Sequence, residues 1–320
     1  MFEPVFSAMS PLWAITNSVA RVLLRPGAKR LPCPVVSVGN IVAGGVGKTE
    51  LVAALAARLV KQGRRVTVAS RGYGSRWERE GAVAFDVETA VSHRFPDEAI
   101  VLLKKAPGVA VCVGADRHGA LTRHWEELHP DVVLLDDGYQ HFALARDLDV
   151  LVHDFELRWP VLREFPGALS RARVRVALSD VPKQWRGLPW VRARYRLTGA
   201  VDAASRRHEL PGEAHAFCGI GNPARFRKSL VAAGTRVTAF KTFRDHAPYS
   251  IAQARELARW AAGKPLLTTL KDYVKLAPFA ESQGGVAGFE PRWVELSLEL
   301  IENEQLLWSA LDEALQKKPS

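Results

Sequence analysis

A glycine-rich segment near the start of the chain, Ser37 to Glu50, constrains the fold more than any other feature. It reads SVGNIVAGGVGKTE and lies between an apolar run that predicts a strand, 34–38, and a periodic stretch that predicts a helix, 48–62. A strand, a glycine loop and a helix in this order direct backbone N–H groups toward phosphate oxygens at the positive end of the helix. The segment therefore predicts a P-loop nucleotide site.

Six consecutive residues of this segment form the expected cofactor-binding site: Gly44, Gly45, Val46, Gly47, Lys48 and Thr49. The glycines allow close backbone approach, the lysine is expected to reach the β- and γ-phosphates, and the threonine is expected to supply a hydroxyl to Mg²⁺. Val42 stands where the strict pattern has its first glycine. The alternative interpretation is a structural glycine turn.

A second segment, VVLLDDGYQH at 132–141, places two carboxylates after a buried strand. If this strand neighbours 34–38, Asp136 and Asp137 lie beside the phosphate loop at the carboxyl edge of the sheet. The second acidic element of P-loop NTPases holds Mg²⁺ in this position. In isolation an Asp-Asp-Gly turn would be the better interpretation, but together with Lys48 the metal site is favoured.

Strand and helix patterns alternate along most of the chain, including one expected helix at 117–128 and a final one at 301–316. This rhythm predicts an α/β fold of the P-loop NTPase-like type, with a mostly parallel sheet flanked by helices and a second, smaller α/β domain. The length of 320 residues accommodates two domains. We expect a nucleotide-binding domain at 31–181, completed by C-terminal elements, a connection at 182–212, and a domain at 213–320 that closes over the active-site cleft.

Charge and cysteine content limit the classes of partner and compartment. The formal charge of +10 favours polyanionic partners, but arginine-rich blocks with aromatics and Cys/His fingers are missing from the sequence, so we expect no nucleic acid. Cys33, Cys112 and Cys218 are widely spaced in apolar runs, which predicts buried thiols in a reducing compartment. With no secretory signal pattern, the chain is expected to stay in the cytoplasm.

The segment 1–30 predicts an amphipathic helix. Its apolar residues recur at helical spacing: Leu12, Ile15, Val19, Val22 and Leu23. Such a helix either docks on its own domain or lies in a membrane interface, with Trp13 at headgroup depth and its basic residues near anionic lipid. The sequence leaves both interpretations open.

Several segments together resemble the tetraacyldisaccharide 4'-kinase family, within the P-loop NTPase superfamily. They occur in family order: VGNIVAGGVGKT at 38–49, SRGYGSR at 70–76, the acidic pair at 97–98, GADR at 114–117, LDDGYQHFALARDLDVLVHD at 135–154, AFCGIGNPARF at 216–226, FRDHAPY at 243–249 and LLTTLKDYVKL at 266–276. The resemblance spans nearly the whole chain.

The resemblance implies an enzyme that uses ATP and Mg²⁺ to phosphorylate the 4'-hydroxyl of a tetraacyldisaccharide 1-phosphate. The product would be lipid IVA in lipid A biosynthesis, made on the anionic cytoplasmic face of the bacterial inner membrane. Asp97 matches the catalytic aspartate of the family, and His246 matches the histidine that works with it. The expected substrate contacts are Arg71, Arg117, Gln140, His141 and Arg171.

Three positions depart from the family pattern. PDEA replaces GDEP around Asp97, Ala247 replaces a frequent second histidine, and FPGALSR at 165–171 is a reduced form of a family block. The first two leave both expected catalytic residues in place. The third leaves open whether Arg171 or Arg173 contacts the acceptor.

Two other functions remain possible on sequence grounds. A membrane-associated P-loop switch ATPase has a similar loop, but it offers no role for the second α/β half. A soluble small-molecule P-loop kinase fits the ATP site equally well and predicts no membrane binding by the N-terminal helix.

Overall fold

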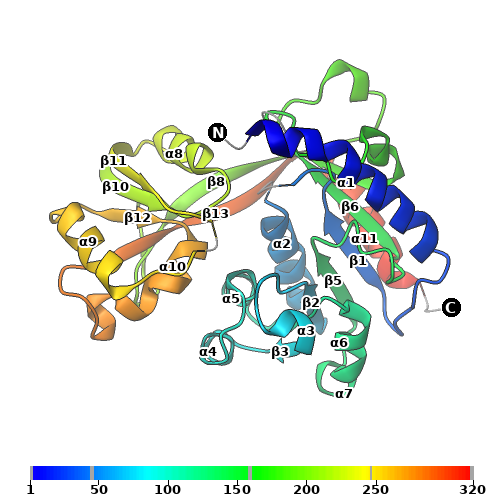
Figure 1. The fold of residues 1–320 in the computed structure, drawn as a ribbon, viewed down its shortest axis with the longest axis horizontal. Coiled ribbons are helices and arrows are strands. Elements are labelled where there is room, and N and C mark those ends of the chain that lie inside the picture. The colour runs from blue at the N-terminus through cyan, green and yellow to red at the C-terminus, as the bar shows by residue number, and fades with distance from the viewer. Residues whose placement is uncertain (1–2, 44–46, 158–160, 246, 318–320) are drawn as a thin grey trace. The chain divides into compact units, whose positions relative to one another are not determined.

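The computed structural model describes residues 3–43, 47–157, 161–245 and 247–317. The chain forms two compact units, which Figure 1 colours along the sequence. The first contains Met1–Arg194 and Leu298–Ser320, and the second contains Tyr195–Ser297. Both boundaries fall inside strands, β8 (Val191–Val201) and β13 (Pro291–Glu302), so the C-terminal residues rejoin the first unit.

The first unit contains a sheet with the strand order β8-β7-β6-β1-β5-β2-β4-β3. Besides β8, its strands are β1 (Val35–Gly39), β2 (Val66–Ser70), β3 (Ala82–Ala84), β4 (Ala110–Val113), β5 (Val132–Asp136), β6 (Leu148–His153) and β7 (Val174–Ala177). Neighbouring strands are parallel except for the β3–β4 pair. Every residue of β1, β2, β4 and β5 is buried, as a sheet covered on both faces requires. The predicted mostly parallel sheet is confirmed.

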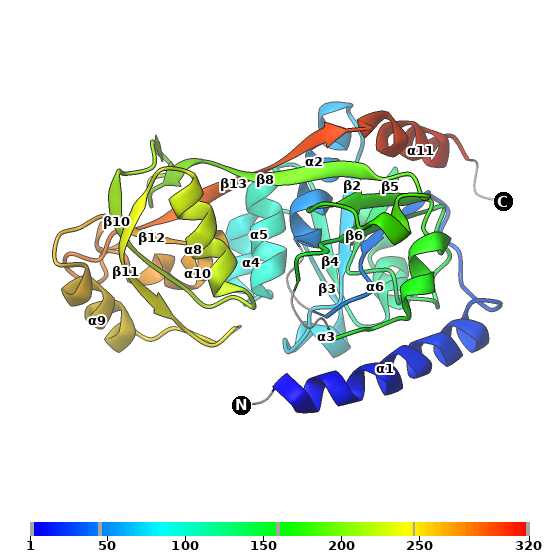
Figure 2. The same ribbon diagram turned by 90° about the horizontal axis from the view of Figure 1, so that it is seen from above.

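Helices cover both faces of this sheet. The helices of this unit are α1 (Glu3–Leu24), α2 (Lys48–Lys61), α3 (Trp77–Glu80), α4 (Val87–Ser92), α5 (Asp97–Lys105), α6 (Arg117–Arg123), α7 (Trp125–Leu128) and α11 (Glu304–Gln316), with 3-10 turns η1 (Pro166–Arg171) and η2 (Lys183–Trp185). Helices α2 and α11 lie on one face and α6 on the other (Figure 2). Leu121 of α6 and Leu128 of α7 share a core cluster with Val133 and Leu135 of β5.

The second unit is a smaller α/β layer structure. Its strand order is β11-β10-β12-β13-β8, with β9 paired to β8. The elements not yet named are β9 (Arg207–His208), β10 (Glu213–Cys218), α8 (Pro223–Ala232), β11 (Arg236–Thr242), α9 (Ile251–Ala261), β12 (Leu266–Thr268), α10 (Leu270–Leu276), η3 (Ala277–Phe279) and η4 (Glu281–Gln283). Ala216 and Phe217, adjacent on β10, belong to two different core clusters. Both faces of this sheet are therefore covered.

Some sequence-based boundaries differ from the structure. The expected helix at 117–128 is two helices, α6 and α7, separated at His124. The expected helix at 301–316 begins only at Glu304, because β13 continues to Glu302 and Asn303 has a left-handed φ of 58°. The segment 182–212 contains all of η2, β8 and β9.

The three cysteines are buried and free of disulfides, as predicted. Burial raises the pKa of each thiol, that of Cys33 to about 12, which keeps these side chains in the unreactive thiol form. None of the helices in the described ranges combines the length and apolar character needed to cross a bilayer.

Candidate active site

The phosphate loop leaves β1 at the centre of the first sheet and ends where α2 begins. Gly47 precedes the helix with φ 82° and ψ 26°, a left-handed conformation that favours glycine. Lys48 and Thr49 follow as the first two helical residues. Because Gly47 has no side chain, an anion can approach the N–H groups of Lys48 and Thr49 at the start of the helix closely. Gly44, Gly45 and Val46, which were also predicted to bind nucleotide, lie outside the described residues.

The acidic pair follows β5, which lies directly beside β1. Val38 is paired in register with Asp136, and Asp136 Oδ2 accepts a hydrogen bond of 2.9 Å from the Thr49 hydroxyl. Lys48 Nζ lies 3.2 Å from Asp137 Oδ1. The structure thus brings together the four residues that the two sequence segments singled out.

The two carboxylates have opposite pKa shifts. Burial raises the pKa of Asp136 to about 6, and the charge of Asp137 adds to the effect. Burial also acts to raise the pKa of Asp137, but Lys48 and Arg163 outweigh it and hold that pKa at about 2. Asp137 is therefore an anion between two cations, whereas Asp136 lacks a full counter-charge.

The surroundings of Asp136 fit a divalent cation. Its Oδ1 atom is buried without a hydrogen-bond partner in the structure, and its Oδ2 atom adjoins the Thr49 hydroxyl. Clusters of three or more His, Cys, Asp or Glu side chains suited to a metal are not found among the residues described. The Asp136 carboxylate and the Thr49 hydroxyl instead match the donors expected for Mg²⁺. In phosphoryl-transfer sites this ion uses one or two carboxylates together with the substrate phosphates and water.

The buried Arg117 contacts the partly buried His141 near the acidic residues. Arg117 Nη1 lies 3.1 Å from His141 Nδ1. Burial, followed by the charge of Arg117, lowers the pKa of His141 to about 3, so the ring is neutral. Because a guanidinium can only donate, Nδ1 accepts and the ring proton is on Nε2. His141 can therefore donate one hydrogen bond from Nε2 to a ligand.

Gln140 and Arg171 both contact Glu164, whose side chain is 1% exposed. Gln140 Nε2 donates to Glu164 Oε1 at 2.9 Å and also to the Asn40 carbonyl. Arg171 forms an ion pair with the other carboxylate oxygen. Arg71 is separate from this group, because it is exposed and paired with Glu78 at 2.7 Å.

Sequence reasoning missed Arg163 and Glu164. Arg163 donates to Asp137 Oδ2 at 2.7 Å, and Glu164 orders two of the predicted substrate residues. The only available signal was an Arg-Glu pair directly before the FPGALSR segment. A basic and an acidic residue side by side are too common to indicate a site.

Asp97 is the first residue of α5, after Pro96 at the N-cap. Helix α5 packs on α2, and an ion pair between Lys105 and Glu50 links the two helices. Asp97 is thus carried by a helix that contacts the phosphate-loop helix. His246 lies outside the described residues.

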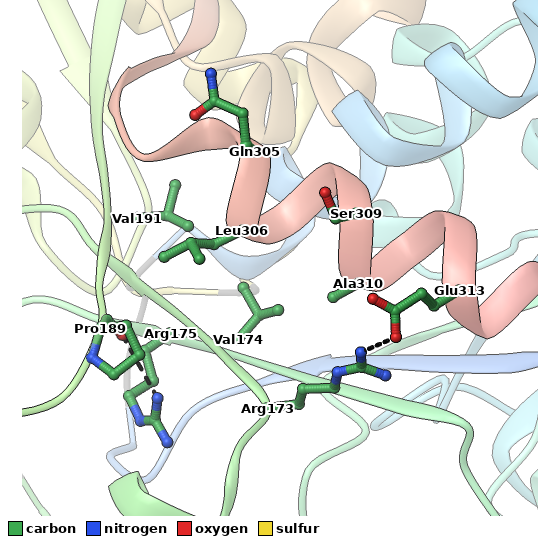
Figure 3. A pocket seen from close by; sticks show the side chains of 10 residues that line it. All are labelled: Arg173, Val174, Arg175, Pro189, Val191, Gln305, Leu306, Ser309, Ala310 and Glu313. Atoms are coloured by element: carbon green, nitrogen blue, oxygen red, sulfur yellow. Dashed lines mark hydrogen bonds and ion pairs between the residues drawn. The ribbon is translucent and has the colours of Figure 1, made fainter.

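A groove of about 280 Å³ lies elsewhere on the first unit (Figure 3). Val174 and Val191, at the starts of β7 and β8, form one side, and α11 forms the other. An ion pair between Arg173 and Glu313 lies at the groove. It adjoins the amino ends of these strands, whereas the phosphate loop follows the carboxyl end of β1. Arg173, the alternative to Arg171 for the acceptor contact, lines this groove, whereas the other predicted site residues do not.

Comparison with known proteins gives consistent matches. The family model described as tetraacyldisaccharide-1-P 4'-kinase matches residues 4–316. The tetraacyldisaccharide 4'-kinase of Pelobacter propionicus is 36% identical over 293 residues, covering 83% of this chain and 81% of the relative. That of Geobacter sulfurreducens is 38% identical over 271 residues, covering 78% and 76%. A crystal structure of LpxK from Aquifex aeolicus in complex with ATP matches with a TM-score of 0.74 and 26% identity, covering 98% of this chain and 100% of that one.

Proposed function

The chain belongs to the tetraacyldisaccharide-1-P 4'-kinase family, and on this premise we propose that it transfers the γ-phosphate of ATP to the 4'-hydroxyl of a tetraacyldisaccharide 1-phosphate. The product would be lipid IVA in lipid A biosynthesis. The observation that carries this proposal is the pair of contacts from Lys48 to Asp137 and from Thr49 to Asp136. Through these contacts the lysine and threonine at the start of α2 lie beside the acidic pair. This supports the proposal because in P-loop NTPases the loop lysine contacts the phosphates, while a threonine or serine and an aspartate hold Mg²⁺.

In this proposal the loop from Gly44 to Thr49 binds ATP. Lys48 would contact the phosphates once nucleotide competes for it with Asp137. Thr49 and Asp136, with Asp137 beside them, would hold Mg²⁺, which supplies charge neutralisation to the phosphates when bound. The partner-free Asp136 Oδ1 atom supports this assignment.

Asp97 is proposed as the group that accepts the proton of the acceptor hydroxyl, with His246 assisting. The support from this chain is the position of Asp97 at the start of a helix packed on α2. General-base catalysis contributes roughly 10² to 10⁴ in rate. The family resemblance around both residues supplies the remaining support.

Arg71, Arg117, Gln140, His141 and Arg171 are proposed to contact acceptor or nucleotide. The neutral His141 ring, held by Arg117, offers one donor. Glu164 fixes Gln140 and Arg171 relative to each other. An exposed guanidinium such as that of Arg71 suits an anionic phosphate.

The exposed face of α1 supports peripheral or monotopic binding to an anionic membrane, on the cytoplasmic face of the bacterial inner membrane. Its apolar side chains are turned outward, with Leu12 64%, Val22 67% and Leu23 72% exposed. Ala14, on another side of the helix, is 0% exposed. A row of exposed apolar side chains on a helix that is followed by the basic residues Arg25, Lys29 and Arg30 suits the lipid interface. Nucleic acid is not expected to be a partner.

Product analysis tests the proposal. Purified protein, Mg²⁺ and ATP are incubated with the tetraacyldisaccharide 1-phosphate in detergent micelles, and ³¹P NMR follows the lipid. A new phosphomonoester at the 4' position is expected, and a 4'-deoxy acceptor should remain unchanged. A lipid that stays monophosphorylated while ATP is hydrolysed would exclude the proposed acceptor and favour a switch ATPase.

A further inference from the structure

A short segment, 161–164, runs beside the start of the phosphate loop. Leu162 forms an isolated antiparallel bridge with Val42. Backbone hydrogen bonds of 2.7 Å join Ala43 N–H to the Val161 carbonyl and Arg163 N–H to the Ile41 carbonyl. The backbone of Arg163 is therefore fixed to the same residues that lead from β1 into the loop.

Helix α1 contacts this segment from outside. Asn17 Nδ2 donates a hydrogen bond of 2.8 Å to the Arg163 carbonyl, across 146 residues of sequence. The Arg163 guanidinium carbon lies 5.6 Å from the centroid of the Trp13 ring, within the range of a cation–π contact. Asn17 and Trp13 are one helical turn apart, so α1 contacts both the backbone and the side chain of Arg163.

The side chain of Arg163 then reaches the acidic pair. Its Nη1 atom donates to Asp137 Oδ2 at 2.7 Å, and Asp137 Oδ1 lies 3.2 Å from Lys48 Nζ. One side chain, 20% exposed, thus joins the N-terminal helix to the carboxylate paired with the phosphate-loop lysine.

We propose that Asn17 and Trp13 are positioning residues that hold Arg163 against Asp137, so that α1 orders the acidic pair of the nucleotide site. This inference rests on the proposed function only in assigning that pair to Mg²⁺ and ATP. It gives α1 two separable roles. The exposed apolar residues Leu12, Val22 and Leu23 bind lipid. Trp13 and Asn17, which contact Arg163, support the active site.

Variants on the two sides of α1 separate these roles. Asn17→Asp keeps the size of the side chain but removes the donor. Thr16→Ala is its matched control because the Thr16 hydroxyl donates within the helix, to the Leu12 carbonyl. Leu23→Asp alters the outward face. All are made in the full chain and assayed in detergent for turnover, and with anionic phosphatidylglycerol vesicles for association.

Asn17→Asp is expected to lower kcat about fivefold to tenfold, the factor that corresponds to one net hydrogen bond, with vesicle association unchanged. Leu23→Asp should weaken vesicle association. Thr16→Ala should change neither. Equal kcat for Asn17→Asp and Thr16→Ala would overturn the inference, and so would a loss of thermal stability in Asn17→Asp with unchanged kcat.

A double-mutant cycle tests whether Asn17 acts through Arg163. In an Arg163→Met background, Asn17→Asp should cause no further loss, whereas independent, multiplying effects would contradict the proposal.

A second measurement on the same variants is the Mg²⁺ concentration at which binding of a fluorescent ATP analogue is half-maximal. Asn17→Asp should raise this concentration several-fold, and an unchanged value would count against the inference. This readout needs no lipid acceptor. If the wild type fails to phosphorylate the lipid, the proposed function fails while this binding test still decides the role of Asn17.

Discussion

The Thr49 hydroxyl donates to Asp136 Oδ2 at 2.9 Å, although 87 residues separate the two in the chain. The contact follows from the parallel pairing of β1 with β5, which aligns Val38 with Asp136. The loop after β1 and the carboxylates after β5 consequently meet at one edge of the sheet. In the proposed function, Thr49 and Asp136 would hold the magnesium ion that accompanies ATP.

Removing the Thr49 hydroxyl should impair turnover. Thr49→Val keeps the side-chain shape but loses both the bond to Asp136 and the proposed metal ligand. We expect kcat to fall roughly 100-fold, the usual effect of deleting one charge-stabilising group. Steady-state kinetics at saturating Mg²⁺ measure it. Thr122→Val, at an exposed position of α6, is the control, and equal rates for both variants would exclude a role for Thr49.

Lys48→Met should weaken nucleotide binding. The change removes the cation at the start of α2 while keeping its alkyl chain, so ATP affinity is expected to fall about 10-fold to 100-fold, as for one lost hydrogen bond to a charged group. Isothermal titration with ATP measures this directly. Lys61→Met, at the other end of the same helix, should bind ATP as the wild type does. Undiminished binding by Lys48→Met would remove the loop from the ATP site.

Asp97→Ala and His246→Ala should slow the chemical step far more than they weaken ATP binding. A general base acts in the transition state, so we expect turnover to fall by roughly 10² to 10⁴ with ATP affinity within threefold. Asp86→Asn is the control, because Asp86 is also an aspartate at a helix start and caps α4. A variant that retains near-normal turnover on the lipid would show that its residue is not catalytic.

His153 should make the fold sensitive to acid. Burial lowers its pKa to about 4, below the ordinary value near 6.5, so the unfolded chain binds the proton more readily. Stability is therefore complete above pH 6.5 and falls as pH drops toward 4. Between pH 7 and pH 5 the loss from this residue is about 2 kcal/mol. Denaturant titrations should show a weaker pH dependence for His153→Gln. If His153→Gln kept the pH dependence of stability of the wild type, His153 would not be its source. The same would follow if His93→Gln, at an exposed position, weakened that dependence equally.

Asp272→Asn should destabilise the second unit. The fully buried carboxylate accepts hydrogen bonds from Gly219 N–H at 2.9 Å, Tyr249 Oη at 2.9 Å and Thr269 Oγ1 at 2.7 Å. In Asp272→Asn an NH₂ group replaces one carboxylate oxygen and faces the donors that this oxygen accepted from. We expect the free energy of unfolding to fall by about 3 kcal/mol. Denaturant unfolding is the measurement. Glu256→Gln makes the same charge change at an exposed ion pair with Lys241 and should cost less than about 1 kcal/mol. Equal stability of the two variants would contradict the role of Asp272.

Much of the nucleotide site could be predicted from the sequence because its signals are local. The strand at 34–38, the glycine loop and the helix that begins at Lys48 are encoded within about 20 consecutive residues. The apolar run ending in Asp136 and Asp137 is equally local. Because strands that alternate with helices pair in parallel, their carboxyl ends lie at the same edge of the sheet, and the two segments are expected to meet there.

The remaining features depend on contacts between distant segments. Arg163 has no local pattern, and its importance comes from α1 and Asp137, which are far from it in sequence. The C-terminal end of β13 could not be predicted, because the alternation of apolar and polar residues at 294–300 continues into apolar residues that also suit a helix. In the structure, the left-handed backbone of Asn303 separates β13 from α11. The sequence likewise could not tell whether the apolar face of α1 points toward the domain or outward. The structure decides this, because Ala14 is buried while the apolar residues are exposed.

The stoichiometry of label transfer tests the central claim most directly. The protein is incubated with Mg²⁺, [γ-³²P]ATP and the tetraacyldisaccharide 1-phosphate in detergent, and lipid-bound label is compared with the ADP formed. Transfer through the Lys48 and Asp136 site predicts one label in the lipid for each ADP, and none with Lys48→Met. Label that appears only as inorganic phosphate, or transfer that survives Lys48→Met undiminished, would contradict it.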